Sequence, residues 1–191
     1  MFVVTADQMS SRSTPDLVPE TLESLRELNE SFERTVGDEI QGVSEDPGEV
    51  RAIVLLLLRA GRWHVGIGAG EGRYGSTVRD GSGPAFLHAR AAVESAKKVT
   101  RFEPSIAVRA EDQQVAADCQ GLLRLLGHVV QSRSEAQWEA IDALRAGATP
   151  AEIAANLGIS VEAVSQRRGY GGMALEDGVL PLLDGLLRKL S

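Results

Sequence analysis

The sequence predicts an α+β protein in which a mixed unit of strands and helices, residues 1–130, precedes an all-helical unit, residues 134–191. Three observations support this class. β-prone runs alternate with helical patterns through the first hundred residues, a polar break interrupts the chain at Gln131–Ser134, and the last 58 residues carry helical patterns alone. The length of 191 residues fits one or two small domains.

The first unit is expected to follow the order βαββαβ. Its predicted elements are a strand at 2–6, a helix at 19–29, hairpin strands at 31–36 and 40–43, a helix at 47–60 and a strand at 63–67. This order is typical of a ferredoxin-like fold, in which one antiparallel sheet lies under two helices. A glycine-dense loop at 68–83 then leads to a helix at 84–98, an edge strand at 105–109 and a helix at 112–130.

Composition excludes several classes of protein. The hydrophobic fraction of 43% and the charged fraction of 25% are those of an ordinary soluble protein, and the longest apolar run, Ala52–Leu58, is too short to span a membrane. The segment Met1–Gln8 lacks the basic start of a signal peptide. One cysteine and three histidines far apart in sequence argue against disulfides and a zinc site. We therefore expect a cytoplasmic protein without a membrane partner.

Negative charge is concentrated at the start of the chain. Residues 1–49 contain twelve acidic residues against three basic ones, although the whole chain carries only −7. Such a segment repels a nucleic-acid backbone and attracts cations. A solvated helix face at 19–33 accounts for part of this charge, but it does not account for Asp7 or Asp38, which end predicted strands.

Those two aspartates suggest a metal site. Gly37 favours a tight hairpin, which places Asp38 and Glu39 at its tip, while Asp7 ends the first strand. If the two strands are neighbours, the carboxylates of Asp7 and Asp38 meet at one edge of the sheet. Because paired carboxylates repel each other, a cation between them stabilises the arrangement. The alternative is a plain surface turn rich in acidic residues.

The second unit carries a helix-turn-helix pattern over 149–167. Thr149 caps a helix that opens with Pro150, Gly158 supplies the turn and Ser160 caps the next helix. The residues expected in its core are Ile153, Ala154, Leu157, Ile159 and Val164. The pattern resembles the bacterial helix-turn-helix of the sigma-region-4 and two-component-regulator type. A helix at 135–141, anchored by Trp138, completes a bundle of three helices.

In such proteins the second helix enters the major groove of DNA. The residues that this arrangement places at the DNA are Ser160, Val161, Glu162, Ser165, Gln166, Arg167 and Arg168, with Arg167 near phosphate. Two features favour the alternative of a bundle used only for packing or protein contacts. Residues 133–170 contain five acidic residues against four basic ones, and Gly169, Gly171 and Gly172 follow the helix early.

Three segments of the first unit resemble class III nucleotidyl cyclases. They are Val4–Arg12, Arg34–Asp38, and Val65–Gly70 followed by Gly83–Arg90. The fuller pattern, which includes the Gly-Asp-Glu hairpin, the Gly-Pro-Ala-Phe helix start and the C-terminal helix-turn-helix, resembles the SatD family of small bacterial proteins. This resemblance covers nearly the whole chain.

The cyclase resemblance implies a set of roles. Asp7 and Asp38 would bind Mg²⁺ or Mn²⁺ with support from Glu39, and a nucleotide would be bound by Arg34, Gly68, Gly70, Asp80 and Arg90. The chemistry implied is metal-assisted phosphoryl transfer. However, Phe86 stands where cyclases place a transition-state asparagine, and the loss of one such donor costs a factor of about 10² to 10³ in rate. The resemblance therefore favours a binding pocket without turnover.

Three functional hypotheses follow. The first is a DNA-binding regulator in which a cyclase-like domain senses a nucleotide or a metal. The second is a divergent Mg-dependent nucleotidyl cyclase or transferase that uses Asp7 and Asp38, and the third is a protein–protein scaffold. We expect a homo-oligomer for the first, with the apolar segment 179–187 either as the dimer contact or packed on the core of the three-helix bundle.

Overall fold

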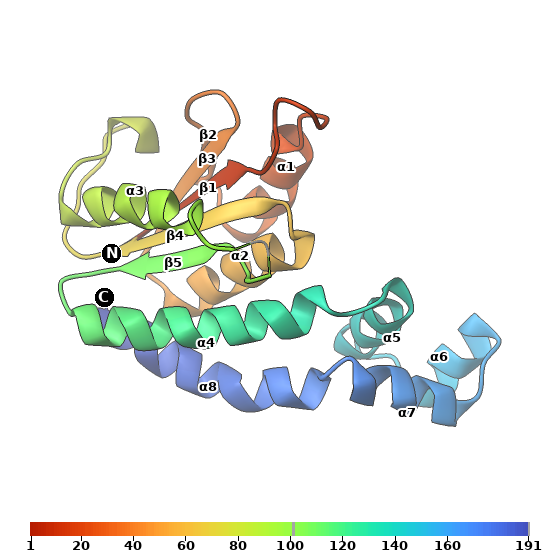
Figure 1. Cartoon of the computed structure of the whole chain (residues 1–191). Helices are drawn as coiled ribbons and strands as arrows, with labels where there is room; N and C mark the ends of the chain where they lie inside the picture. Colours follow the sequence, from red (N-terminus) through yellow and green to blue (C-terminus); the bar gives the residue numbers. More distant parts are fainter. Residues whose placement is uncertain (101, 191) are drawn as a thin grey trace.

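The computed structural model describes residues 1–100 and 102–190 as a five-stranded mixed sheet with helices on both of its faces (Figure 1). The strands are β1 (Phe2–Gln8), β2 (Glu33–Arg34), β3 (Glu39–Ser44), β4 (Trp63–Ala69) and β5 (Ile106–Arg109). The helices are α1 (Val18–Leu28), α2 (Pro47–Ala60), α3 (Pro84–Ala96), α4 (Gln113–Gln131), α5 (Glu135–Arg145), α6 (Pro150–Leu157), α7 (Val161–Tyr170) and α8 (Met173–Leu190), with a short 3₁₀ turn, η1 (Val78–Asp80).

The strand order in the sheet is β2-β3-β1-β4-β5. β1 is antiparallel to both β3 and β4, and β2 is antiparallel to β3, whereas β5 is parallel to β4. The sheet is therefore mixed rather than purely antiparallel. The parallel pair arises because α3 crosses over the sheet between β4 and β5, a connection that parallel strands require.

The second strand is much shorter than the sequence predicts. Only Glu33 and Arg34 pair with β3, instead of the whole run 31–36. The preceding Phe32 is 1% exposed and turns into the core, where its ring lies over Gly42. Phe32 keeps the register of β2, and before it the Ser31 hydroxyl, rather than the backbone, bonds the Val43 backbone N and O at 2.9 Å, so backbone pairing begins only at Glu33.

The two faces of the sheet pack differently. Phe2, Val4 and Ala6 share a core with α1, α2, α4 and α8, while Val3 on the other face packs beneath α3. α3 lies very close to β4, because a Cβ added at Gly66 or Gly68 would fall within 2.3 Å of the α3 backbone. These glycines are therefore needed for helix–sheet packing.

The C-terminal helix returns to the first unit. α8 runs back along α4 and brings the C-terminal end close to the N-terminal end (Figure 1). Leu183, Leu187 and Leu190 belong to the same core as Phe2 and Val4, so much of the apolar segment predicted for a dimer contact is buried within the chain. Among the helices of residues 1–100 and 102–190, none has the length and apolar character to cross a membrane.

A buried ionic cluster joins α7 and α8 to α4 and α5. The Arg133 side chain is fully buried, donates to Gly171 O at 2.6 Å and forms an ion pair of 2.6 Å with Glu176. Arg145 reaches the same carboxylate at 2.8 Å, and the guanidinium of Arg133 lies over Trp138. The break predicted at 131–134 is thus a well-packed junction that holds the helices on either side in a fixed relation.

Candidate functional site

The α6–α7 pair has the local structure that its sequence indicates. Thr149 and Glu152 form a reciprocal capping box at the start of α6, and the Ser160 side chain accepts from Ala163 N at 3.1 Å at the start of α7. Between them Gly158 adopts a left-handed conformation with φ of 64°. Apolar side chains close the bundle with α5, and the most buried of them are Ala140, Ile153, Ala154 and Val164.

One face of α7 is exposed to solvent. Val161, Glu162, Ser165, Gln166 and Arg168 are all exposed, although Val164 on the opposite face is 1% exposed. Backbone hydrogen bonding at the start of α7, together with the Ser160 hydroxyl, lowers the pKa of Glu162 and keeps its carboxylate charged. These five of the seven predicted DNA-contacting residues are therefore exposed on α7; Ser160 caps the helix, and Arg167 is partly buried.

The two neighbouring arginines differ. Arg167 forms an ion pair with Glu139 of α5 at 3.1 Å and its side chain is only 26% exposed. Arg168 makes no hydrogen bond or ion pair with any described residue. Arg133 and Arg145 are held by Glu176, so Arg168 is the only arginine of 133–170 without an ionic partner in the described part of the chain. This surface has little free positive charge.

The predicted metal site lies at the carboxyl end of β1. Asp7 is paired across the sheet with Glu39 on β3 and with His64 on β4, and the Gln8 backbone donates to Asp38 O at 3.2 Å. β1 and β3 are neighbours, as the sequence predicts, and Asp38, in the turn before β3, lies at the same end of the sheet as Asp7. The register places the side chain of Glu39, rather than that of Asp38, directly beside Asp7.

Protein groups already occupy this end of the sheet. Lys97, just after α3, lies 3.0 Å from Asp7 and 3.0 Å from Glu94. Burial lowers the pKa of Lys97, but the carboxylates of Glu94 and Asp7 outweigh it and raise the pKa overall. Glu39 accepts from the Thr35 hydroxyl at 2.5 Å, and burial lowers the pKa of His64, which contacts Ser105 at 2.6 Å. Over the described residues no cluster of three or more acidic, histidine or cysteine side chains suits a metal ion.

The predicted nucleotide-binding side chains are scattered. Arg34 is paired with Asp16 at 2.7 Å, an interaction that lowers the pKa of the aspartate, and its Nε donates to Gly37 O. Asp80 in η1 accepts from Thr77 at 3.0 Å. Arg90 is exposed on α3 and has no ionic or hydrogen-bond partner among the described residues. No described contact joins these three side chains.

The predicted phosphate glycines lie at the opposite end of the sheet from Asp7. Gly68 pairs with Val3, and the Gly70 backbone donates to Met1 O at 3.1 Å. At about 3.3 Å per residue along β1, Met1 and Asp7 are about 20 Å apart. A ligand in contact with both Gly70 and the Asp7 carboxylate would therefore have to span about 20 Å.

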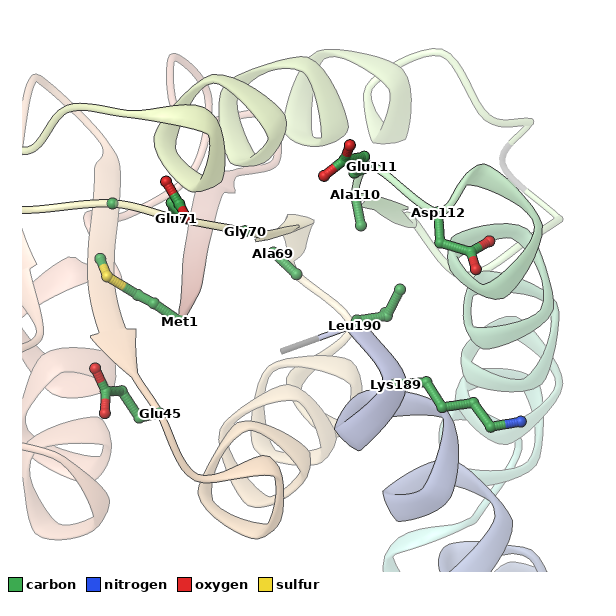
Figure 2. Close-up of a pocket in the computed structure, with 11 residues that line it drawn as sticks. Met1, Glu45, Ala69, Gly70, Glu71, Ala110, Glu111, Asp112, Lys189 and Leu190 are labelled. Atoms are coloured by element: carbon green, nitrogen blue, oxygen red, sulfur yellow. The ribbon is translucent and has the colours of Figure 1, made fainter.

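A cavity of about 710 Å³ opens at that opposite end (Figure 2). It lies beyond the carboxyl ends of the parallel strands β4 and β5, which continue to α3 on one face and α4 on the other. Such a divergence between adjacent parallel strands is a common place for a ligand. The lining residues are Met1, Glu45, Ala69, Gly70, Glu71, Gly72, Ala110, Glu111, Asp112, Lys189 and Leu190.

The cavity is acidic. The carboxylates of Glu45, Glu71 and Glu111 have no hydrogen-bond or ion-pair partner in the described structure, while Asp112 caps α4 through Val115 N at 3.0 Å. Lys189 is the one basic side chain in the lining. This charge disfavours a free triphosphate and favours a cation or a cation-bearing molecule.

Sequence reasoning missed these cavity residues. The signal was present, because Glu45, Glu71 and Glu111 each follow within two residues of the end of a strand. What the sequence did not indicate is that β5 lies parallel beside β4 and that the end of α8 completes the wall.

No protein-family model, curated protein or solved structure matches the chain.

Proposed function

We propose that this chain is a DNA-binding regulatory protein that contacts DNA through the exposed face of α7. The observation that supports this most is the contrast within α7 between a core face and a face whose polar side chains have no intramolecular task. Ser165, Gln166 and Arg168 are exposed on α7, the helix that a helix-turn-helix places in the major groove of DNA.

The proposal treats α6 and α7 as a helix-turn-helix and the first unit as a ferredoxin-like domain extended by β5. The capping box, the left-handed Gly158 and the core of Ile153 and Val164 support the first assignment. The antiparallel order β2-β3-β1-β4 supports the second. Membership of the SatD family remains a prediction from the resemblance of the sequence.

The side chains of α7 suggest which DNA bases this helix would contact. Gln166 has the paired donor and acceptor that match the major-groove edge of adenine, and Glu162 is an acceptor suited to the amino group of cytosine. Arg168 would contact phosphate or guanine. Because Arg168 is the one arginine of 133–170 without an ionic partner among the described residues, each copy should bind non-specific DNA weakly.

α8 would couple ligand binding in the cavity to the position of α7. One end of this helix, Lys189 and Leu190, lines the acidic cavity, and the other end holds Glu176 in the cluster that contacts Gly171 after α7. We propose that a nucleotide with its divalent cation occupies the cavity and biases α7 through this helix, since the described carboxylates do not form a metal cluster by themselves. Titrations of Mn²⁺ in the presence of ATP, followed by thermal unfolding of wild type and Glu71→Gln/Glu111→Gln, test this proposal, because the variant should lose any Mn²⁺-dependent rise in Tm.

The enzyme hypothesis has less support. A metal at Asp7 must displace Lys97, and Gly68 is already in contact with the α3 backbone. Phe86, which stands at the asparagine position of cyclases, packs against Gly81 of the glycine loop, where a Cβ would lie 1.9 Å from the ring. Phe86 and Gly68 thus serve in packing, and neither supplies the group that cyclase catalysis would need at its position.

The function is tested by selecting fragments from a genomic DNA library at about 50 mM salt with the whole protein. We expect the wild type to enrich one sequence class and Gln166→Ala to lose that enrichment while unfolding at the same temperature. Glu135→Ala, at an exposed position outside α7, is the control and should select as the wild type does. Absence of any enriched sequence with the wild type would contradict the proposal.

A further inference from the structure

Tyr170, the last residue of α7, is 84% exposed, and its hydroxyl has no hydrogen-bond partner among residues 1–100 and 102–190. The backbone next to it is nevertheless well packed. Arg133 Nε donates to Gly171 O at 2.6 Å within the buried ionic cluster, and a Cβ added at Gly171 would lie 2.8 Å from Ile141 of α5. The ring of Tyr170 therefore reaches solvent from an anchored part of the chain.

The helical period puts Tyr170 on one flank of the open side of α7. At about 100° per residue, Ser165 and Gln166 lie about 40° and 60° to either side of Gly169 around the helix axis. A Cβ added at Gly169 would meet no atom within 4 Å, so this side of the helix is open. Arg168 and Tyr170 each lie about 100° from Gly169, in opposite directions. The open side of α7 therefore has an arginine on one flank and a tyrosine on the other.

The dimensions of DNA give both flanks a partner. The major groove of B-DNA is about 12 Å wide, and an α-helix with its side chains is about 10–12 Å across. An inserted helix therefore fills the groove, and the residues on its two flanks lie against the two sugar–phosphate backbones. When the side of Gly169 faces the base edges, Arg168 faces one backbone and Tyr170 faces the other.

We propose that Tyr170 is a further DNA contact of α7, in which its hydroxyl donates a hydrogen bond to a backbone phosphate. This contact deepens the proposed function and rests on it. Tyrosine hydroxyls are among the groups that contact phosphate oxygens, and such contacts fix the register of a protein on the duplex. Tyr170 lies about 6 Å beyond Gln166 along the helix axis. It therefore holds the last turn of α7 at the backbone while the first turns reach the bases.

An uncharged donor suits this surface, which has little free positive charge. In the described part of 133–170, only Arg168 among the arginines lacks an ionic partner, so a second cationic phosphate contact is not at hand. A tyrosine hydroxyl neutralises no phosphate, and its hydrogen bond therefore releases no condensed counterion. The contribution of Tyr170 to DNA affinity should be independent of salt, whereas that of Arg168 should fall as salt rises.

Removal of the hydroxyl tests the contact on a DNA fragment selected by the wild type. We expect Tyr170→Phe to weaken binding about fivefold at every salt concentration, with the salt slope and the Tm of the wild type. Tyr74→Phe, at the other tyrosine of the chain, is the matched control and should bind as the wild type does. Replacement of single phosphates by neutral methylphosphonates locates the contact. At one position the replacement should weaken the wild type about fivefold and leave Tyr170→Phe unaffected.

Chemical modification gives a second measurement, since the chain has only two tyrosines. In the free protein, tetranitromethane should nitrate both Tyr170 and Tyr74, which is 49% exposed. In the complex with the selected DNA, Tyr170 should lose most of its nitration while Tyr74 keeps its rate.

The outcomes separate this contact from the proposed function. Equal binding by wild type and Tyr170→Phe, or unchanged nitration of Tyr170 in the complex, would overturn the contact alone, because the wild type has then still selected DNA. A wild type that selects no DNA sequence would overturn the contact together with the proposed function.

Discussion

The exposed face of α7 and the Asp7 end of the sheet both carry residues that the sequence predicts to be functional. The two regions differ in whether these side chains already have partners within the protein. On α7, Ser165, Gln166 and Arg168 point away from the core with no partner assigned to them in the described chain. At the sheet end, Asp7 is paired with Lys97 and Glu39 with Thr35. The first surface is available to another molecule, whereas the second is largely satisfied from within.

This difference shows what decides whether a candidate residue is free. On a short helix, the residues that face outward are fixed by the 3.6-residue period and by the core positions. At the end of a sheet, availability depends on which side chains arrive from distant elements. Lys97 follows α3, ninety residues after Asp7 along the chain. Its ion pair with Asp7 gives the aspartate an internal partner in place of a metal ion.

The largest expected effect is that of Gly68→Ala, which asks whether a predicted phosphate glycine is structural. An added Cβ would lie 2.1 Å from Ala85 O and 2.2 Å from Ala89 N, so α3 must move away from β4. We expect a loss of about 3 kcal/mol in the free energy of unfolding, measured by urea denaturation. Gly178→Ala, where a Cβ meets nothing, should change stability by less than about 0.5 kcal/mol. Equal stability of both variants would show that Gly68 is not needed for packing, and a role in phosphate binding would then be open to it.

The second prediction concerns Lys97→Met, which removes the internal cation from the sheet end. Without metal, we expect a loss of less than about 1 kcal/mol, because the Lys97 side chain is 31% exposed and the pair is screened by solvent. In Mn²⁺, this variant should gain more in Tm than wild type, since Asp7 and Glu39 then repel each other unless a cation lies between them.

Two controls accompany that measurement. Asp7→Asn in the Lys97→Met background should abolish the Mn²⁺ response, and so should Asp38→Asn if both aspartates are ligands. Lys98→Met, at an exposed neighbouring position, controls for the loss of a lysine. If all variants respond to Mn²⁺ alike, the sheet end is an acidic turn without a metal site.

The smallest expected effect concerns His64, which is half-buried beside Asp7. Burial lowers the pKa of His64 in the folded protein, so below the ordinary value of 6.5 the unfolded chain binds more protons. The stability of wild type should therefore be complete above pH 6.5 and decline as the pH falls to 5, by less than about 1.4 kcal/mol per pH unit. His64→Asn should show a shallower decline in denaturation experiments, and His128→Asn is the control. An identical decline in wild type and His64→Asn would show that this histidine does not contribute.

The sequence was informative where structure is local. The cap at Ser160, the left-handed Gly158 and the buried Val164 follow from a few consecutive residues, and the structure has each of them. It was partly informative for the sheet, because the βαββαβ order sets which strands are neighbours but says little of how many residues pair. β2 keeps two residues because the Ser31 hydroxyl, rather than the backbone before Glu33, bonds Val43.

It was least informative where partners come from far along the chain. Nothing near Asp7 in sequence indicates Lys97, and nothing near Arg133 indicates Glu176, which meets it across the junction. The packing of Leu183 and Leu187 on α2 and α4 also depends on α8 running back along α4 towards the first unit. Apolar periodicity shows that a helix is amphipathic, but it does not identify the surface that the helix covers.

The central claim is that α7 contacts DNA through its free face, and the two adjacent arginines test it most directly. On a DNA fragment selected by the wild type, binding should be measured across about 50 to 200 mM salt for Arg168→Ala and Arg167→Ala. We predict that Arg168→Ala weakens binding at least fivefold and reduces the salt slope by about 1 per copy, while Arg167→Ala, which loses only the pair with Glu139, keeps the wild-type slope. Equal slopes for wild type and Arg168→Ala would contradict the claim.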